Sequence, residues 1–580
     1  MTSPDSPTLV SPSPCPPPPP SLPTSPVPSS PAPSSSSLPL PPSLPPTGEV
    51  MVLALGRKKQ RVLIVLSILP NLFLAFLLSS DPLITLSSPH HCHLPGPSPS
   101  PEMLNISLPW EKGLRPGESG ELSQCKQYAN GSQSVVVDCQ AGWDYKVTEG
   151  LKNNIVTEWD LVCDRYWLVP VEEVCFILGA LTGCLGLGFA ADRIGRYKTL
   201  LTSLTLSVVF GVLVCVSPYP SIFIVMRFCL AAANAGVYLI LYISRLELCE
   251  PSLRLISTVL AGLMTVSGEL LLLAVALGCQ SWRGLLGTGA APLALFLCYG
   301  IPGVFPESPR WLLLSERHSD MNTFGERRNS SRDLRDDESF TELDSEPTPS
   351  SLPHLSFPEL VHSRNIWKNI CVLGFTSFIS HGISHCYSSF RGDVRGTAPG
   401  FYWTYLLSVC AGGAAWVLLW VTVDRCGRRG ILLLFMTMTG LASLILLGLM
   451  KYLSENAITV FSVMGLFSSQ ATASLCILLT AEIMPTVIRG TGVGVVLALG
   501  CVGRLSSPLM DLRNHYGYFL HHVVYSSLAL LAVLSILLLP ESKRKSLPQT
   551  LADGEQYRRP PLGRRRRDNV PLLATPNPET

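Results

Sequence analysis

Apolar residues gather along this chain into long uninterrupted blocks instead of alternating with polar ones. Blocks of about 18–23 residues recur, the length at which a helix crosses the hydrocarbon core of a bilayer. A chain inside lipid must satisfy its own backbone hydrogen bonds, so each block is predicted to be a membrane-spanning helix. Twelve such blocks are present, at residues 62–80, 168–190, 199–217, 221–243, 256–278, 285–305, 366–388, 402–423, 431–450, 457–480, 491–508 and 518–539.

A polar segment divides the blocks into six and six. It covers residues 312–364 and is rich in serine and in charges of both signs. Residues 1–60 are dominated by proline and serine and are expected to be a disordered cytoplasmic N-terminus. The other domain boundaries follow from these two polar segments. We expect an N-terminal half at 61–311 that includes a long loop at 81–167, a cytoplasmic linker at 312–364, a C-terminal half at 365–541 and a basic cytoplasmic tail at 542–580.

Basic residues mark one side of the membrane. They precede the first block and follow the second and the eighth, at Arg57, Lys58, Lys59, Arg61, Arg193, Arg196, Lys198, Arg425, Arg428 and Arg429. By the positive-inside rule this side is the cytoplasm, and both termini lie there. The loop at 81–167 is then extracellular, and the predicted location is the plasma membrane.

Signals within that loop agree with an extracellular position. It holds two glycosylation acceptors, Asn105 and Asn130. It also holds four cysteines, which suggest two disulfides with three possible pairings: Cys92, Cys125, Cys139 and Cys163. Histidines flank the first of these cysteines, but surface histidines beside a disulfide explain the same letters, so no metal site and no cofactor are predicted.

A charged motif repeats six helices apart. Asp-Arg-x-Gly-Arg follows the second block and again the eighth, at Asp192, Arg193, Gly195, Arg196 and at Asp424, Arg425, Gly427, Arg428. The glycine permits a tight turn between helices, and the aspartate can pair with a helix end or a neighbouring arginine. Such a repeated latch is typical of a transporter that rocks between two conformations.

The repeated motif resembles that of the major facilitator superfamily, an all-α membrane fold of twelve helices in two six-helix halves. Four stretches are similar to signatures of solute carrier family 22, the organic cation and anion transporters: "TEWDLVCDRYW" (157–167), "PESPRWL" (306–312), "AEIMPTVIRGTGVG" (481–494) and "PESKRK" (540–545). Within that family, "RNIWKN" (364–369), "ISHCY" (383–387), "ENAITVFSVMGLFSSQA" (455–471) and the tail "VPLLATPNP" (570–578) resemble the branch described as brain-type organic cation transporter and lipocalin-2 receptor.

The resemblance places a substrate-selecting charge in the eleventh helix, where cation carriers have an aspartate and anion carriers an arginine. The matching position here is Cys501, and Arg504 lies about one turn further. An intramembrane arginine needs a partner or water. Three alternatives remain open for it: a pair with Glu269 in the fifth block, a substrate contact, or an interfacial position near the helix end. His381 and His385 share a face of the seventh block, where packing is favoured over substrate contact.

Three functions remain open. The resemblance favours a receptor that binds an extracellular lipocalin carrying siderophore-iron and enters cells by endocytosis, cycling through endosomes. The alternative is an alternating-access carrier of a small organic ion, and the third is a scaffold. The tail offers an acidic dileucine signal for an endocytic adaptor at Asp568, Leu572 and Leu573, and Ser330 behind two arginines is a phosphorylation candidate. No catalytic constellation and no nucleic-acid site are found, so we predict a non-enzyme.

Overall fold

The computed structural model describes residues 57–94, 101–111, 121–129, 135–147, 150–314, 363–393, 400–449, 452, 455–511, 517–543 and 545–556. All structural statements below refer to these residues. Several predicted features lie outside them: Asn130, Ser330, Asp568, Leu572, Leu573 and the side chain of His385.

The N-terminal half begins with a broken span. Three short helices form it, α2 (Arg57–Ile68), α3 (Asn71–Leu78) and α4 (Asp81–Ile84). The span therefore starts before the predicted residue 62, and it breaks at Pro70, whose ring cannot continue a helical ladder. The helices that follow are α7 (Leu168–Ile194), α8 (Arg196–Cys215), α9 (Pro220–Leu248), α10 (Arg254–Gly278), α11 (Trp282–Ala290) and the 3-10 helix η3 (Ala291–Gly300).

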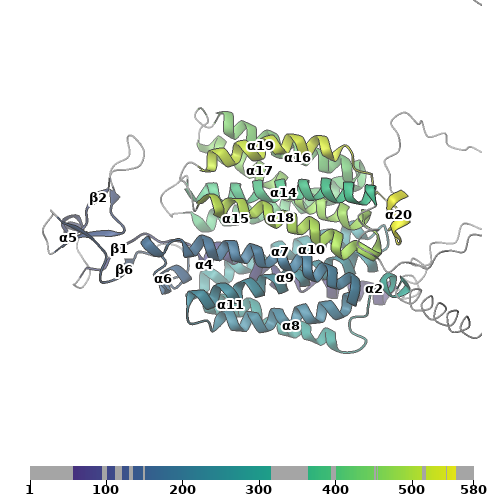
Figure 1. The fold of residues 1–580 in the computed structure, drawn as a ribbon, viewed down its shortest axis with the longest axis horizontal. Coiled ribbons are helices and arrows are strands. Elements are labelled where there is room, and N and C mark those ends of the chain that lie inside the picture. Colours follow the sequence, from purple (N-terminus) through teal and green to yellow (C-terminus); the bar gives the residue numbers. More distant parts are fainter. Residues whose placement is uncertain are drawn as a thin grey trace, which may run out of the picture. The chain divides into compact units, whose positions relative to one another are not determined.

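The C-terminal half repeats the plan. Its elements are α14 (Arg364–Asp393), α15 (Phe401–Cys426), α16 (Arg428–Leu449), α17 (Glu455–Ile483), the short 3-10 helix η4 (Thr486–Ile488), α18 (Arg489–Asp511), α19 (Gly517–Ile536) and the tail helix α20 (Leu551–Gln556). Figure 1 shows α14 to α19 in green and yellow and α7 to α11 in blue. In the described part of the chain, nine helical segments are long and apolar enough to cross a membrane.

Each half has its own apolar core. One buried cluster draws mainly on α14 to α19, with Phe435 and Leu475 among its members, and another draws on α3, α7 to α11 and η3, with Phe223 and Trp282. Side chains that face outward on the long helices are apolar and exposed, as expected for lipid contact, for example Phe189. The halves meet where α7 packs against α18 and where α10 packs against α15.

The 81–167 region folds into a small subdomain of short β-strands. Its three antiparallel pairs are β1 (His90–Cys92) with β6 (Trp143–Tyr145), β2 (Trp110–Glu111) with β3 (Glu121–Leu122), and β4 (Lys126–Tyr128) with β5 (Val136–Asp138). Two short helices accompany them, α5 (Pro101–Ser107) and α6 (Ile155–Glu158). Disulfides join Cys92 to Cys139 and Cys125 to Cys163, which selects one of the three pairings left open by the sequence.

Helix α6 anchors this subdomain to the bundle. Asn154 caps the helix and donates a hydrogen bond to the Leu86 carbonyl (2.8 Å), while Glu158 accepts one from Trp282 Nε1 (2.8 Å) and pairs with Arg283. Partial burial acts to raise the pKa of Glu158, but the hydrogen bonds from Arg283 and Trp282 outweigh it and the pKa is lowered. The anchor is therefore stabilised by the ionised carboxylate.

Acidification is expected to remove this contribution. Because the folded-state pKa of Glu158 is lowered, its stabilisation is present above the unfolded pKa of about 4.3 and is lost as the pH falls through the folded value. Thermal midpoints of the wild type and of Glu158→Gln should differ at pH 7 and converge below about pH 4. Glu102→Gln on the exposed side of α5 is the control and should show no such convergence. A gap that persists at low pH would contradict this prediction.

Candidate functional site

The first copy of the charged motif forms the turn between α7 and α8. Gly195 has a φ of 111°, a conformation that residues with a Cβ rarely adopt. Arg196 starts α8, and its side chain is 1% exposed. It forms salt bridges with Asp192 (3.2 Å) and with Glu247 near the end of α9 (3.3 Å). The turn thus places a buried arginine between acids from two helices.

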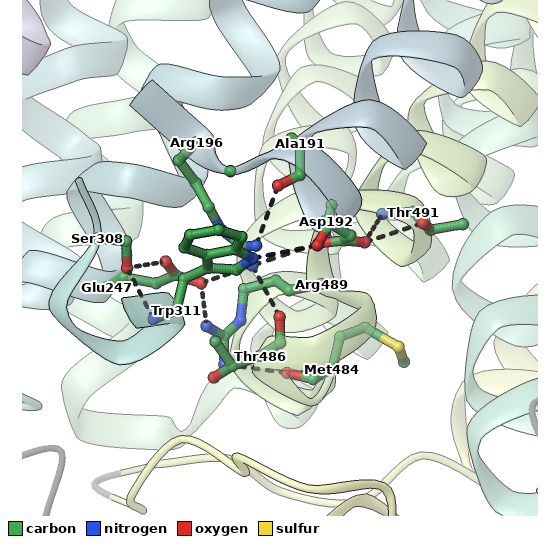
Figure 2. A network of polar contacts seen from close by, with 12 residues as sticks. Ala191, Asp192, Arg196, Glu247, Ser308, Trp311, Met484, Thr486, Arg489 and Thr491 are labelled. Atoms are coloured by element: carbon green, nitrogen blue, oxygen red, sulfur yellow. Dashed lines mark hydrogen bonds and ion pairs between the residues drawn. The ribbon is translucent and has the colours of Figure 1, made fainter. Parts of the chain in front are cut away.

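Asp192 connects the N-terminal half to the C-terminal half (Figure 2). Its carboxylate accepts hydrogen bonds from the backbone N–H groups of Gly490 (2.9 Å) and Thr491 (2.7 Å) and from the Thr491 hydroxyl (2.9 Å). These N–H groups belong to the first turn of α18, where the backbone lacks internal acceptors and the helix dipole favours an anion. Asp192 therefore caps a helix of the opposite half.

Glu247 lies at the centre of the same network. Its side chain is fully buried and accepts hydrogen bonds from Arg489 Nη1 (2.6 Å), Arg196 Nη2 (3.3 Å) and the Ser308 hydroxyl. Arg489 comes from the C-terminal half and Arg196 from the N-terminal half. We call Asp192, Arg196, Glu247 and Arg489 the charge cluster. Two acids balance two arginines, so the cluster is neutral although it is buried.

Backbone carbonyls accept further hydrogen bonds from both arginines, although Arg196 Nε has no partner among the described residues. Arg196 donates to the carbonyl of Thr486 across the junction (2.7 Å), and Arg489 donates to those of Ala481 and Met484 (both 3.1 Å). A buried ion pair stabilises a structure only when such extra hydrogen bonds offset the loss of water. All three side-chain nitrogens of Arg489 meet this requirement, and so do both terminal nitrogens of Arg196, whereas Arg196 Nε does not.

Glycines allow α7 and α18 to touch beside the cluster. A Cβ on Gly188 would lie 2.7 Å from the Gly490 carbonyl oxygen, and one on Gly490 would lie 2.5 Å from that of Gly188. Neither distance accommodates a carbon atom, so the two helices meet backbone to backbone. Small residues commonly permit such close crossings in membranes.

The second copy of the motif has the same local form but a different environment. Gly427 has a φ of 88°, and Arg428 is 2% exposed, with salt bridges to Asp424 (3.0 Å) and Glu482 (3.4 Å). The Asp424 side chain, however, is 50% exposed, whereas that of Asp192 is 6% exposed. The two motif copies therefore differ in whether their aspartate is enclosed by the opposite half.

Two further repeated elements complete the site, and the sequence had suggested most of their letters only as family signatures and not as repeats. Glu-x6-Arg occurs at the end of α9 and again at the end of α17, and Pro-Glu-Ser follows each half. The acids of the second element accept hydrogen bonds from the backbone N–H groups that start α8 and α16. The residues concerned are Glu247, Arg254, Glu482, Arg489, Glu307 and Glu541. The same comparison of halves that revealed the first motif could have found them.

The start of the C-terminal tail packs onto this junction. We call Glu541–Gln556 the tail segment. Its Pro548 carbonyl accepts from the Thr486 N–H (3.1 Å), and its Lys545 carbonyl accepts from Arg254 of the N-terminal half (3.0 Å). Glu555 in α20 accepts from the Asn365 N–H at the start of α14 (2.9 Å). This part of the tail, which we expected only to be basic, is thus an ordered contact between both halves.

The charged residues predicted inside the membrane lie within electrostatic reach of each other but do not pair. The charge of Arg504 acts on Glu269 in α10 and on His381 in α14. In the described part of the chain, however, no salt bridge joins Glu269 to Arg504, so this structure does not show the first of the three alternatives for Arg504. Glu269 instead accepts a hydrogen bond from Ser79 (3.1 Å). Arg504 is exposed and lies two residues before the end of its span, Thr486–Ser506.

Cys501 and His381 are oriented differently from Arg504. The Cys501 side chain is 8% exposed and faces α7, where it interacts with Cys184. His381 Nδ1 donates to the Ser377 carbonyl one turn earlier in its own helix (2.9 Å), and it lies against Gly500. The position that the resemblance associates with charge selection is therefore a buried thiol, and the nearby charge is carried by Arg504.

In the 81–167 loop, one glycosylation candidate is exposed, and the cysteines near His90 are already bonded to each other. Asn105 is exposed on α5, where a glycan would have room. His90 lies close to the sulfurs of Cys125 and Cys163 and so has the spacing of a metal cluster. Those sulfurs form a disulfide with each other, however, and a disulfide sulfur is a poor metal ligand.

Comparisons with known proteins agree with this architecture. The family described as "Sugar (and other) transporter" matches residues 164–550. Human solute carrier family 22 member 17 is 41% identical over 93% of this chain and 89% of its own length, and human member 23 is 32% identical over 90% and 82%. The proton:xylose symporter XylE of the major facilitator superfamily shares the fold, with a TM-score of 0.56 at 15% identity over 86% of this chain and 98% of its own. This chain is therefore a multi-pass membrane protein with the twelve-helix facilitator fold, belongs to solute carrier family 22, and is not an enzyme.

Proposed function

We propose that this protein is an alternating-access carrier of small organic anions in the plasma membrane. The single observation that carries the proposal is the charge cluster, in which Glu247 and Asp192 of one half bind Arg489 and the α18 N-terminus of the other. Such a junction closes one side of the protein and can be broken when the halves rock apart. By the positive-inside rule the closed side is the cytoplasmic one.

The positive charge of Arg504 supports an anionic substrate. Arg504 is exposed although it lies in a membrane span, and its charge acts on residues of both halves, including Glu269 and His381. A cation in that position favours a substrate carboxylate or sulfonate. Glu269 is held by Ser79, so its carboxylate does not neutralise Arg504 by direct contact.

Uptake measurements test this proposal. Cells that express the protein should accumulate one or more radiolabelled organic anions from a panel, with saturation. Arg504→Ala should reduce that uptake at least about tenfold, which corresponds to the loss of a charge contact with the substrate worth about 1.4 kcal/mol or more. Arg504→Lys keeps the charge and should retain part of the activity. Uptake of cations alone, or equal uptake by Arg504→Ala, would overturn the anion assignment.

A second candidate is the lipocalin receptor suggested by the sequence resemblance. The observation that favours it is the extracellular subdomain, which two disulfides hold together and which exposes the apolar side chains of Met103, Ile106 and Trp110. Such side chains are common at the centre of protein interfaces. The adaptor signal in the tail would then drive endocytosis of the complex.

Uptake of a fluorescent lipocalin separates the two candidates. Under the receptor proposal, expressing cells take up the lipocalin, Trp110→Ala weakens binding, and replacement of Leu572 and Leu573 by alanine leaves the receptor at the surface. The matched control replaces Val570 and Pro571, which the dileucine signal does not require. A lipocalin that does not bind, or internalisation that the leucine replacements leave unchanged, would contradict this candidate.

A further inference from the structure

Two buried cysteines from opposite halves face each other above the charge cluster. Cys184 belongs to α7 and is 4% exposed, and Cys501 belongs to α18 and is 8% exposed. Their side chains lie next to each other and interact. Neither thiol takes part in the charge cluster, and both remain unoxidised in the structure. A thiol pair shared by two moving halves is a site where a covalent bond would fix their relative position.

The packing of the two helices explains why the thiols meet. Residues four apart share a helix face, so Gly188 and Cys184 lie on one side of α7, while Gly490, Gly494 and Ala498 lie on one side of α18. Gly490 contacts Gly188, Gly494 contacts the Cys184 backbone, and Ala498 shares a buried apolar cluster with Cys184. The second cysteine is one turn beyond Ala498. The same close crossing that seals the junction therefore brings the sulfurs together.

We propose that Cys184 and Cys501 form a reversible disulfide that locks the two halves together. In the reaction the two thiols lose two electrons and two protons to a peroxide oxidant, so that one S–S bond forms, the O–O bond of hydrogen peroxide breaks and two waters leave. A dithiol reductant reverses the step by thiol–disulfide exchange.

The bond would keep α7 against α18 and hold the motif-bearing side closed. This consequence rests on the proposed carrier function, because only an alternating-access protein needs the halves to separate there. The disulfide itself does not depend on transport. The two extracellular disulfides lie within the N-terminal half, so they cannot join one half to the other. A covalent connection between halves is therefore a specific readout for Cys184 and Cys501.

The test uses the full chain with a specific protease site inserted in the 315–362 segment, outside the described helices. After treatment with hydrogen peroxide and then protease, the wild type should run as one full-length species without reductant and as two fragments after dithiothreitol. Cys184→Ser and Cys501→Ser should each give a several-fold smaller joined fraction, whereas Cys476→Ser, a buried cysteine within the C-terminal half, should leave it unchanged. Cys501→Ala provides a second variant if the serine variant fails to elute as a folded monomer in gel filtration.

The outcomes separate the two proposals. Wild-type halves that come apart after peroxide, or halves that stay joined in both serine variants, would overturn the disulfide. If the halves join and anion uptake falls until dithiothreitol restores it, both the disulfide and the lock are supported. If the halves join but an established uptake is unchanged, the lock is wrong while the disulfide stands. Joined halves in a protein that takes up no anion at all would leave the disulfide standing and count against the carrier function.

Discussion

Replacing Glu247 by glutamine is expected to lower the free energy of unfolding by about 3–5 kcal/mol, the range for removing one partner of a buried ion pair. The glutamine keeps the shape of the side chain but leaves Arg196 and Arg489 with one counter-charge instead of two. Both arginines are at most 1% exposed, so water cannot replace the lost carboxylate. The measurement is the thermal midpoint of the purified protein in detergent.

Two further variants make this prediction specific. Glu250→Gln carries the same chemical change three residues away, in the loop after α9, on a carboxylate that forms no salt bridge with the described residues, and should change stability little. Glu247→Gln combined with Arg489→Gln restores charge neutrality and should recover part of the loss. A Glu247→Gln protein as stable as Glu250→Gln would contradict the assigned role of the cluster. So would a double variant whose loss of stability exceeds the sum of the losses in the two single variants.

Hydropathy predicted the helices well but not where they end. The fourth block was expected at 221–243, whereas α9 continues to Leu248 and includes Arg245 and Glu247. Charged letters normally mark the end of a membrane helix, so a search for apolar runs stops there. These residues remain helical and buried because Glu247 is paired with arginines from elsewhere in the chain, a compensation that no local pattern contains.

The sequence predicted the kind of interaction that the site makes, but not the residues that take part in it. The repeated motif correctly suggested that Asp192 could bind a helix end or an arginine, but nothing in the letters identifies Gly490 and Thr491, which lie 298 and 299 residues further on. The equality of the two motif copies was also misleading. Asp424 stands in the same motif, yet its side chain is 50% exposed, whereas Asp192 is enclosed by the α18 N-terminus.

The pair considered between Glu269 and Arg504 is not formed in this structure. Both are intramembrane charges of opposite sign. Because an isolated charge in lipid is costly, the sequence alone suggests that the two form a pair. The structure offers each of them another solution: Ser79 hydrogen-bonds to Glu269, and Arg504 is exposed. The exposure of a side chain is a property of the assembled bundle and cannot be read from a single helix.

Replacing Gly490 by alanine is expected to force α7 and α18 apart. The added carbon would lie 2.5 Å from the Gly188 carbonyl oxygen and 2.8 Å from Asp192 Oδ1, and a backbone oxygen cannot move aside as a flexible side chain can. Overpacking of this kind costs about 1–3 kcal/mol, and it acts only while the motif-bearing side is closed. The variant should therefore expose the buried thiol of Cys184. The rate of maleimide labelling at Cys184, followed by peptide mass spectrometry, should rise several-fold.

Gly448→Ala in α16 is the matched control, since a Cβ there would meet no atom within 4 Å. It should leave labelling of Cys184 unchanged and raise stability by about 0.5–1 kcal/mol, because alanine loses less backbone freedom than glycine in a helix. Cys249, which is equally buried but lies in the loop after α9, reports on general loosening of the fold. Faster labelling of Cys184 in Gly490→Ala, with Cys249 unaffected, would locate the change at the junction of the halves. Equal acceleration at both thiols would instead mean that the substitution destabilises the whole bundle, and the close crossing would then not be what holds this side shut.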